Sequence, residues 1–489
     1  MAAGRPRTLA RMRVFVLLCF MFDATMLAVA QASPENPAIW YAITSGGGAQ
    51  IGYASTEFVE RADGRDVIET QAVFLQEQGE PASDIVERIV YSQDRSGRTL
   101  AINATTQTGR FVSRTAVRIS DETAHIVNET PAGRWTGSVR LGPSVRFDSG
   151  EGMLAGWSPA AAPRLEFDNF NVDAMGVDHV VIEAQPQSDS AGRVSALRFE
   201  YHDGGLVGVT RLNIDRQGRL IESVQPMFGS ALHMRMTDRR TALAPHLPYP
   251  LIPNAAVRSP VRISPGAAQG HIRYRFAFGD GIAFPLPQSG EQRVSQQGGG
   301  AIVDICDACG PGLAADPNAL ADALAPTVWM QSDDPRLRAI AAPVAAMAIS
   351  DTQKMRLLLQ RAKPYIARPD YAGHYSALDT ISRRAGDCTE AAVLLAALGR
   401  AAGIPTRVAS GLAYSRQAYF GVSNAFMPHS WTLAYVDGRW RSFDLALEDF
   451  DSTHIVLTVG NGDARSIAAA SQLASLLRFD SLAEVRPAS

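Results

Sequence analysis

The chain has 489 residues, of which 46% are hydrophobic and 19% are charged. This composition is typical of globular proteins and excludes a disordered or fibrous chain. Its 46 Lys and Arg residues and 49 Asp and Glu residues give a formal net charge of -3, so the overall charge does not favour binding to nucleic acid. At about 150 residues per domain, the length allows about three domains.

The first 32 residues have the pattern of a secretory signal peptide. A basic start is followed by an apolar run at residues 14–22, and small residues then provide cleavage sites. An uncleaved anchor is the alternative, but an anchor needs about 20 apolar residues, and Asp23 interrupts this run. We therefore expect residues 1–32, with Cys19, to be removed. The mature protein is then exported, periplasmic or secreted from a bacterium, with no transmembrane span.

Residues 33–242 have the pattern of a β-rich N-terminal domain. Short runs of alternating apolar and polar residues, such as DVIETQAVFLQ and DIVERIVYSQD, are separated by turn residues at intervals of about ten. This spacing predicts antiparallel sheet. The residue types in this region do not indicate a chemical site, so its role stays open between a binding surface and a spacer.

The second half of the chain begins with a predicted proline-rich linker at residues 243–258, because four prolines occur in residues 243–254. Residues 259–312 read as a small β-rich segment that carries a CxxC motif. From residue 313 the apolar period becomes helical, and strand pairs return after residue 426. A β-rich region followed by helices and then strands predicts an α+β protein.

Cys388 is the candidate nucleophile, because it lies in the first turn of a well-marked helix. Asp387 and Glu390 have the spacing of a capping box around it. Unpaired N–H groups and the helix dipole favour a thiolate at such a position and can bring a cysteine pKa to about 3.5–7.5. The same N–H groups can form part of an oxyanion hole. Taken alone, the residue also fits a buried, inert thiol.

A hairpin supplies two partners for this thiol. Residues 428–436 alternate as a strand, and the Asp-Gly pair that follows favours a two-residue turn. In the resulting register Asp444 lies opposite Trp431 and diagonal to His429 on the same face. Asp444 is therefore predicted to orient His429, which together with Cys388 describes an activated thiol nucleophile. Individually, a core histidine and a strand-end carboxylate are the alternatives.

These segments resemble the core of the bacterial transglutaminase-like superfamily. The resemblance rests on GDCTEAAVLLAALGRAAGIPTRVASGLAY at residues 386–414 and FMPHSWTLAYVDGRWRSFDLAL at residues 426–447. It covers about residues 325–460 and does not extend to residues 33–300. The family has a papain-like arrangement with a Cys–His–Asp triad, and the candidate cysteine, histidine and aspartate fall on its three positions.

The resemblance implies that residues 313–489 form a catalytic domain in which Cys388 forms a thioester with an amide carbonyl. We expect an exported peptidase or amidase acting on a protein or peptide of the cell envelope, with transfer to an amine as the other outcome. Some family members have lost activity, so a silent binding or scaffold protein of the envelope is the alternative. The triad implies neither a cofactor nor a metal.

The CxxC motif admits three interpretations. A zinc site needs four ligands, and a second cysteine pair is missing from the sequence. A thioredoxin-like site would be surrounded by a βαβ unit, which the pattern does not indicate. In an exported protein we expect a local disulfide between Cys306 and Cys309, which leaves Cys388 as the odd cysteine.

Three further side chains are candidates for the substrate cleft. Trp431 and Tyr414 could line an acyl site, although core packing explains them equally well. His374 precedes the candidate nucleophile by fourteen residues and could also line the cleft, with a surface histidine as its alternative. His454 is interpreted as structural, because it lies at the start of a predicted strand.

Overall fold

The protein is described by a computed structural model that covers residues 38–76, 83–147, 154, 157–159, 161–188, 193–215, 218–227, 230–246, 248–250, 255–370, 373–417 and 422–485. The predicted signal peptide lies outside these residues. Within them, every helix is too short or too polar to cross a membrane.

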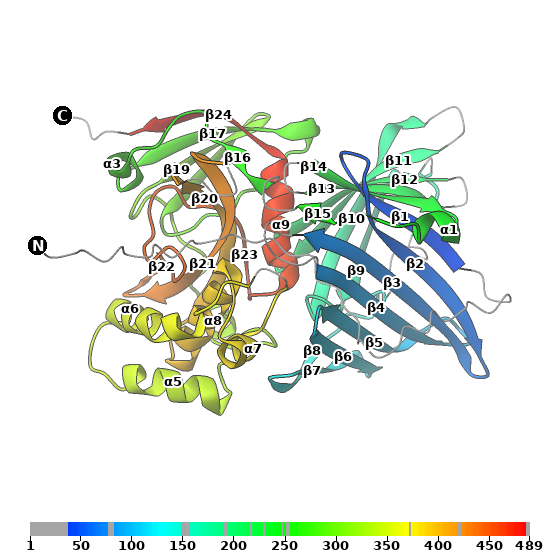
Figure 1. Ribbon diagram of the computed structural model, residues 1–489, viewed down its shortest axis with the longest axis horizontal. Coiled ribbons are helices and arrows are strands. Elements are labelled where there is room, and N and C mark those ends of the chain that lie inside the picture. The colour runs from blue at the N-terminus through cyan, green and yellow to red at the C-terminus, as the bar shows by residue number, and fades with distance from the viewer. Residues whose placement is uncertain are drawn as a thin grey trace, which may run out of the picture.

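The N-terminal half forms one large antiparallel sheet, as predicted (Figure 1). Neighbouring strands are joined mostly by short turns, and the first strand of the chain pairs with the fourteenth, so two meanders meet in the middle of the sheet. The strands are β1 (Ala38–Ser45), β2 (Gln50–Arg61), β3 (Gly64–Gln76), β4 (Ser83–Asp94), β5 (Thr99–Thr108), β6 (Phe111–Ser120), β7 (Thr123–Thr130), β8 (Gly133–Arg140), β9 (Arg164–Asn171), β10 (Gly176–Ser188), β11 (Val194–His202), β12 (Gly205–Ile214), β13 (Leu220–Met227) and β14 (Ser230–Thr237).

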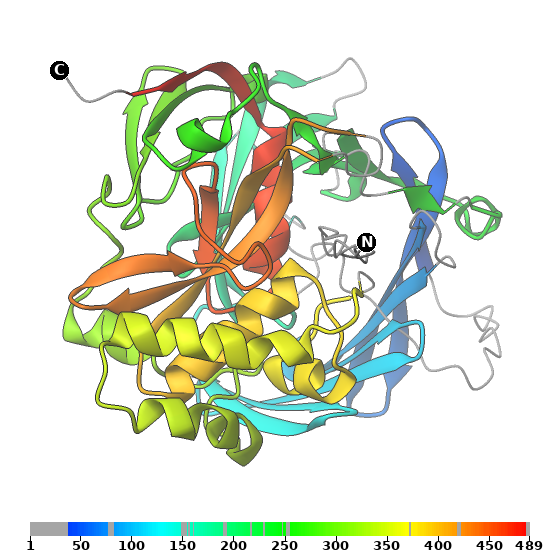
Figure 2. The same ribbon diagram turned by 60° about the vertical axis from the view of Figure 1, so that its left-hand side comes forward.

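The sheet is strongly curved, because its two ends share one core. β8 and β9 stand at opposite ends of the strand order, yet Phe170 of β9 belongs to the same buried cluster as Ile126 of β7 and Ile102 of β5. Arg146, after β8, also forms a bridge with Asn169 of β9. In Figure 2 the blue-to-cyan strands curve around one side of the yellow helices of the C-terminal half.

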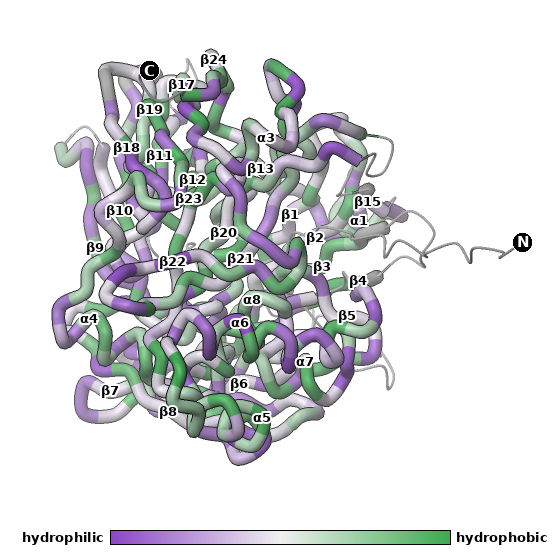
Figure 3. Tube along the Cα trace, turned by 90° about the vertical axis from the view of Figure 1, so that its left-hand side faces the viewer, coloured by the Kyte–Doolittle hydropathy of each residue, from purple (hydrophilic) through white to green (hydrophobic). Residues whose placement is uncertain are grey.

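The C-terminal half is built around a second antiparallel sheet with the order β16-β21-β20-β23, and β22 pairs with β21. Its long central helix α8 packs against β21 and β20, and α5, α6 and α7 pack around α8. The elements are β16 (Val257–Arg258), β20 (Thr406–Ser415), β21 (Ala425–Val436), β22 (Arg439–Phe443), β23 (Ile455–Gly460), α4 (Pro317–Asp322), α5 (Pro335–Ala345), α6 (Asp351–Ala362), α7 (Ala377–Arg383), α8 (Cys388–Ala401) and α9 (Ala464–Ser475). Hydrophilic and hydrophobic residues alternate along the outer helices (Figure 3).

A third sheet brings the small β-rich segment and the end of the chain together. Its order is β18-β19-β17-β24, with β17 (Ile272–Phe278), β18 (Gln292–Gln297), β19 (Gly300–Ile305) and β24 (Leu477–Glu484). Its strands come from both sides of the domain boundary expected near residue 312, because β24 follows that residue and the other three strands precede it. The division of the second half into domains remains a prediction. The expected local disulfide between Cys306 and Cys309 is present.

Helix α9 joins the two halves (Figure 1). It packs against β12 and β13 of the large sheet and against β20 and β23 of the second sheet. Arg465 reaches into the large sheet, where its guanidinium lies 3.3 Å from Asp178 and 2.8 Å from Glu200. Burial favours the neutral form of Glu200, but Arg198 and Arg465 outweigh this and lower its pKa to about 2. The two halves are therefore held together by buried charge as well as by apolar packing.

Candidate active site

The start of α8 has the predicted capping box. The Asp387 side chain accepts the N–H of Thr389 at 2.7 Å, and the Glu390 side chain accepts the N–H of Asp387 at 3.0 Å. Cys388 is the first residue of the helix, is not part of a disulfide, and is only 3% exposed. The helix dipole therefore places its positive end beside this thiol.

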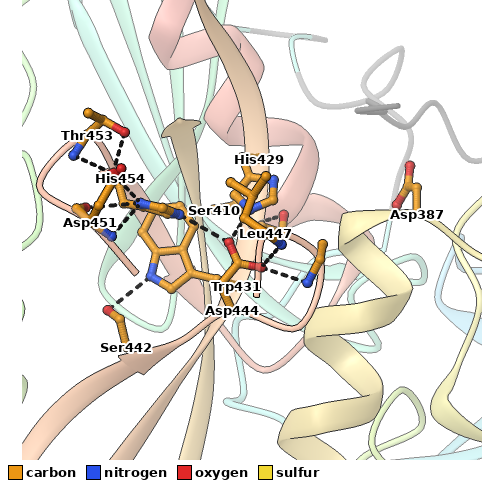
Figure 4. Close-up of polar contacts among 12 residues, drawn as sticks. Asp387, Ser410, His429, Trp431, Ser442, Asp444, Leu447, Asp451, Thr453 and His454 are labelled. Atoms are coloured by element: carbon orange, nitrogen blue, oxygen red, sulfur yellow. Dashed lines mark hydrogen bonds and ion pairs between the residues drawn. The ribbon is translucent and has the colours of Figure 1, made fainter. Parts of the chain in front are cut away.

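The thiol lies on the side of β21 that carries His429. Cys388 shares a buried apolar cluster with Met427, and Ala446 packs against the same cluster. Met427 precedes His429 by two residues in β21, so both side chains point to one face of the strand. Ala446 follows Asp444 by two residues. The start of α8, marked by Asp387, therefore lies on the same side of the second sheet as His429 and Asp444 (Figure 4).

The hydrogen bond expected between His429 and Asp444 is present. The β21–β22 hairpin has the predicted register, in which Val436 pairs with Arg439. His429 Nε2 lies 2.6 Å from Asp444 Oδ2. His429 Nδ1 is buried and has no hydrogen-bond partner among the described residues, so it is the ring nitrogen available for proton transfer.

Asp444 is held as a carboxylate. Its Oδ1 accepts the N–H groups of Ala446 at 2.8 Å and Leu447 at 2.9 Å. Burial would raise the pKa of Asp444, but the charge of His429 and the hydrogen bonds from His429 and His454 outweigh it and hold the pKa well below its usual range. The carboxylate can therefore fix one ring nitrogen of His429 as a donor at all ordinary pH values.

A second histidine that was predicted to be structural joins this group. His454 Nε2 lies 3.1 Å from the same Asp444 Oδ2, and His454 Nδ1 lies 3.0 Å from the carbonyl oxygen of Asp451 (Figure 4). His454 precedes β23, which pairs with β20, and β20 also pairs with β21. Gly411 of β20 is opposite His429 on one side and Val456 on the other. The contact therefore depends on strand order, for which the local sequence carries no signal.

The three cleft candidates lie in different surroundings. Trp431 is completely buried, and its ring packs beside those of both His429 and His454, with centroids 6.0 and 5.1 Å away. Tyr414 is buried in another cluster with Phe426, where its hydroxyl accepts the N–H of Ile263 at 3.2 Å. Tyr414 is therefore not brought into the cluster that contains Cys388.

His374 lies near the start of α8, because the next residue, Tyr375, donates its N–H to Glu390 at 3.1 Å. Its Nε2 contacts the carbonyl oxygen of Gly462 at 2.8 Å. Burial lowers the pKa of His374 to about 4, so the ring is neutral. Together with Asp379, it lines a cavity of about 40 Å³ between the large sheet and the C-terminal half.

Two buried carboxyl groups flank the candidate thiol. Burial raises the pKa of Glu390 to about 7. Burial, followed by the charge of Glu390, raises the pKa of Asp387 well above its usual value. Such closely coupled groups titrate as a pair, so the start of α8 binds a proton at a pH where ordinary carboxyl groups have lost theirs.

We expect the Glu390→Gln variant to remove part of the pH dependence of stability. Glu390 keeps its proton up to about pH 7 in the folded protein but loses it near 4.5 when unfolded. The wild-type protein should therefore lose stability as the pH rises from 4.5 to 7, by up to about 3 kcal/mol. The free energy of unfolding, measured with urea at several pH values across this range, should fall less steeply with pH in the variant than in the wild type. Equal slopes would contradict the raised pKa.

Comparison with known proteins identifies this part of the chain. Residues 338–445 match the model of the transglutaminase-like superfamily. This domain is transglutaminase-like. The match confirms the resemblance expected from the sequence and the α+β class, and it spans α8, β20, β21 and β22. No curated protein matches the chain.

Several solved structures are similar to parts of this chain. A candidate cysteine protease from Cytophaga hutchinsonii is 16% identical, with 44% of this chain and 86% of that chain covered and a TM-score of 0.28. The periplasmic domain of TgpA from Pseudomonas aeruginosa, bound to ethylmercury, is 17% identical, with coverages of 46% and 84% and a TM-score of 0.27. A beta-barrel-like protein of unknown function from Brucella abortus is 12% identical, with coverages of 41% and 95% and a TM-score of 0.33.

Proposed function

We propose that this protein is an exported, cysteine-dependent enzyme that cleaves amide bonds through a thioester on Cys388. The observation that carries the proposal is the buried 2.6 Å contact between His429 and Asp444, on the side of β21 where the apolar cluster places Cys388. The transglutaminase-like match supports a cysteine-dependent enzyme family. Export is supported by the signal-peptide pattern of residues 1–32.

In the proposed reaction each side chain has one role. The Cys388 sulfur, with its proton transferred to His429 Nδ1, attacks the amide carbonyl carbon. The tetrahedral intermediate collapses, the C–N bond breaks, and His429 returns the proton to the leaving amine. Asp444 keeps the Nε2–H of His429 in place and stabilises the imidazolium. The thioester that remains is the acyl-enzyme.

Water is the proposed acceptor of the acyl group. His429 Nδ1 would take a proton from water as its oxygen attacks the thioester carbonyl, and the departing Cys388 sulfur would receive a proton as the acid product leaves. The proposed substrate is a protein or peptide of the cell envelope. Strands of the large sheet cover the thiol, because Ile43, Val73 and Leu232 belong to the apolar cluster of Cys388. This cover supports an enzyme that accepts only a restricted set of substrates.

The test is the pH dependence of Cys388 alkylation by iodoacetamide in the mature protein. We expect labelling well below pH 8, where an ordinary thiol with a pKa near about 8.5 is slow. The His429→Ala variant should label more slowly at that pH. If Cys388 is equally buried in both proteins, slower labelling reports a loss of activation of the thiol and not a loss of access to it. Cys388→Ala should not label, because Cys306 and Cys309 form a disulfide. An ordinary thiol profile that the His429 variant leaves unchanged would favour the silent scaffold instead.

A further inference from the structure

The carboxylate of Asp444 is shared by two buried imidazole rings. Its Oδ2 lies 2.6 Å from His429 Nε2 and 3.1 Å from His454 Nε2. Both rings are closed off from solvent, since the side chains are 0% and 2% exposed. A triad needs only one of these contacts, so the second histidine calls for a separate explanation.

Acceptor oxygens face both ring nitrogens of His454, which favours a protonated ring, while the backbone N–H of Asp451 also lies 3.3 Å from Nδ1. Nε2 faces the Asp444 carboxylate, and Nδ1 faces the Asp451 carbonyl oxygen at 3.0 Å and its carboxylate at 3.3 Å. A neutral imidazole has only one N–H, whereas the imidazolium donates from both nitrogens. Burial would lower the pKa of His454, but the hydrogen bonds that its ring donates to Asp444 and Asp451 outweigh it and raise the pKa to about 9. His454 is therefore a cation at neutral pH.

Other ionisable groups around the two rings come from several elements. Arg416, after β20, lies 4.0 Å from Asp451. Tyr274 of β17 donates its hydroxyl to the Ser452 carbonyl oxygen at 2.7 Å, and burial raises its pKa, so it stays neutral.

Glu291, the residue before β18 of the third sheet, reaches the same group. Its carboxyl accepts the N–H of Ser442 at 2.8 Å, and the Ser442 hydroxyl accepts the indole N–H of Trp431 at 3.1 Å. Burial raises the pKa of Glu291. On the His429 side the group contacts Asp444, and the apolar cluster of Cys388 includes Met427 on the same face of β21. The His454 cation thus stands beside His429 with one carboxylate shared between them.

We propose that His454 is a positioning residue that fixes Asp444 and limits how tightly His429 holds its proton. The two ring centroids are 5.6 Å apart, and two like charges at that distance oppose each other by roughly two pK units at an effective dielectric constant of about 20. This inference rests on the function proposed above, in which His429 must both receive and release a proton. A lone Asp444 carboxylate in this dry site would favour the imidazolium and slow the hydrolysis of the thioester.

The His454→Gln variant tests the charge while keeping a donor, because the glutamine amide N–H can still reach the Asp444 carboxylate. Removing the cation favours protonated His429. The alkaline limb of the Cys388 alkylation profile should therefore move to higher pH by about one to two units. The rate at which the acyl group is released from Cys388 at pH 7 should fall by about 10- to 100-fold. Mass spectrometry of the intact protein at successive times measures this rate.

The matched control is His202→Gln. His202 of β11 is a largely buried histidine on a carboxylate, 2.8 Å from Asp178, and its pKa is likewise raised to about 9, against the effect of burial, by the Asp178 hydrogen bond and neighbouring carboxylates. Because it lies in the large sheet, its loss should change the unfolding temperature and leave the alkylation profile in place.

The possible outcomes separate this inference from the proposed function. A folded His454→Gln protein with the wild-type profile, while His429→Ala changes it, would overturn the role of His454 and leave the function standing. If the wild-type protein already has an ordinary thiol profile and both variants leave it unchanged, the proposed function itself fails. Should His454→Gln not fold, nitrogen NMR of the wild-type histidines decides: we expect a cationic His454 at pH 7, and a neutral ring would overturn the inference.

Discussion

Replacing Cys388 by alanine is expected to abolish amide hydrolysis by the mature protein, with a loss of at least about 10⁴-fold in kcat. The thioester cannot form without the sulfur, and a hydroxyl or water in its place lacks the nucleophilicity of a thiolate. The measurement is peptide release from fluorescently labelled, unfolded casein, together with a search for the acyl-enzyme mass. The wild-type protein should show both signals, and Cys388→Ala should show neither.

Folding must be preserved for this result to concern chemistry. The side chain of Cys388 is buried in an apolar cluster, so loss of its sulfur should lower the free energy of unfolding by only about 1 kcal/mol. Thermal unfolding of Cys388→Ala checks this. A variant that cleaves casein as well as the wild type would show that another group carries the reaction. Casein that neither protein cleaves, together with an ordinary thiol profile, would support the scaffold alternative.

The largest expected effect on stability comes from Arg465→Met. Arg465 of α9 connects the two halves through Asp178 and Glu200. Its removal leaves two buried carboxylates with fewer partners, and breaking a buried ion pair in this way costs about 3–5 kcal/mol. Urea unfolding, followed by tryptophan fluorescence, should show the loss, together with earlier separation of the two halves.

Arg235→Met is the matched control for this variant. Arg235 of β14 pairs with Glu222 at 2.7 Å, but its side chain is 67% exposed. Surface ion pairs contribute at most about 1 kcal/mol because water screens them. A similar loss in both variants would mean that the arginine side chains act through general packing, and an unchanged Arg465→Met protein would remove buried charge as the link between the halves.

The helix that carries Cys388 could be predicted from the sequence because its determinants are local. Asp387 and Glu390 satisfy the first N–H groups of α8, and the leucines of its apolar stripe are buried. Ser350 likewise begins α6 with a capping box. The His429–Asp444 contact was also within reach, because a two-residue turn fixes the register of a hairpin and therefore the diagonal pairs across it.

The antiparallel nature of the N-terminal half was predictable for the same reason, since alternation and turn spacing are local properties. Its curvature was not, because the contact of Phe170 with strands at the other end of the sheet joins segments far apart in the chain. The pairing of β24 with β17 is a similar case. A pattern of strands does not say which distant strand will be a neighbour.

The sequence by itself determined the helix-start thiol, the hairpin partners and the family of this domain, because short-range spacing carries each of them. Tertiary structure alone decided three other features: the burial of Cys388 beneath the large sheet, the charged link at Arg465, and the position of His454 on Asp444. The position of His454 depends on the order of β23, β20 and β21, and the link at Arg465 depends on the docking of α9 between two sheets. Burial then determines their chemistry, because a desolvated charge must find a partner and a shared carboxylate couples two protons.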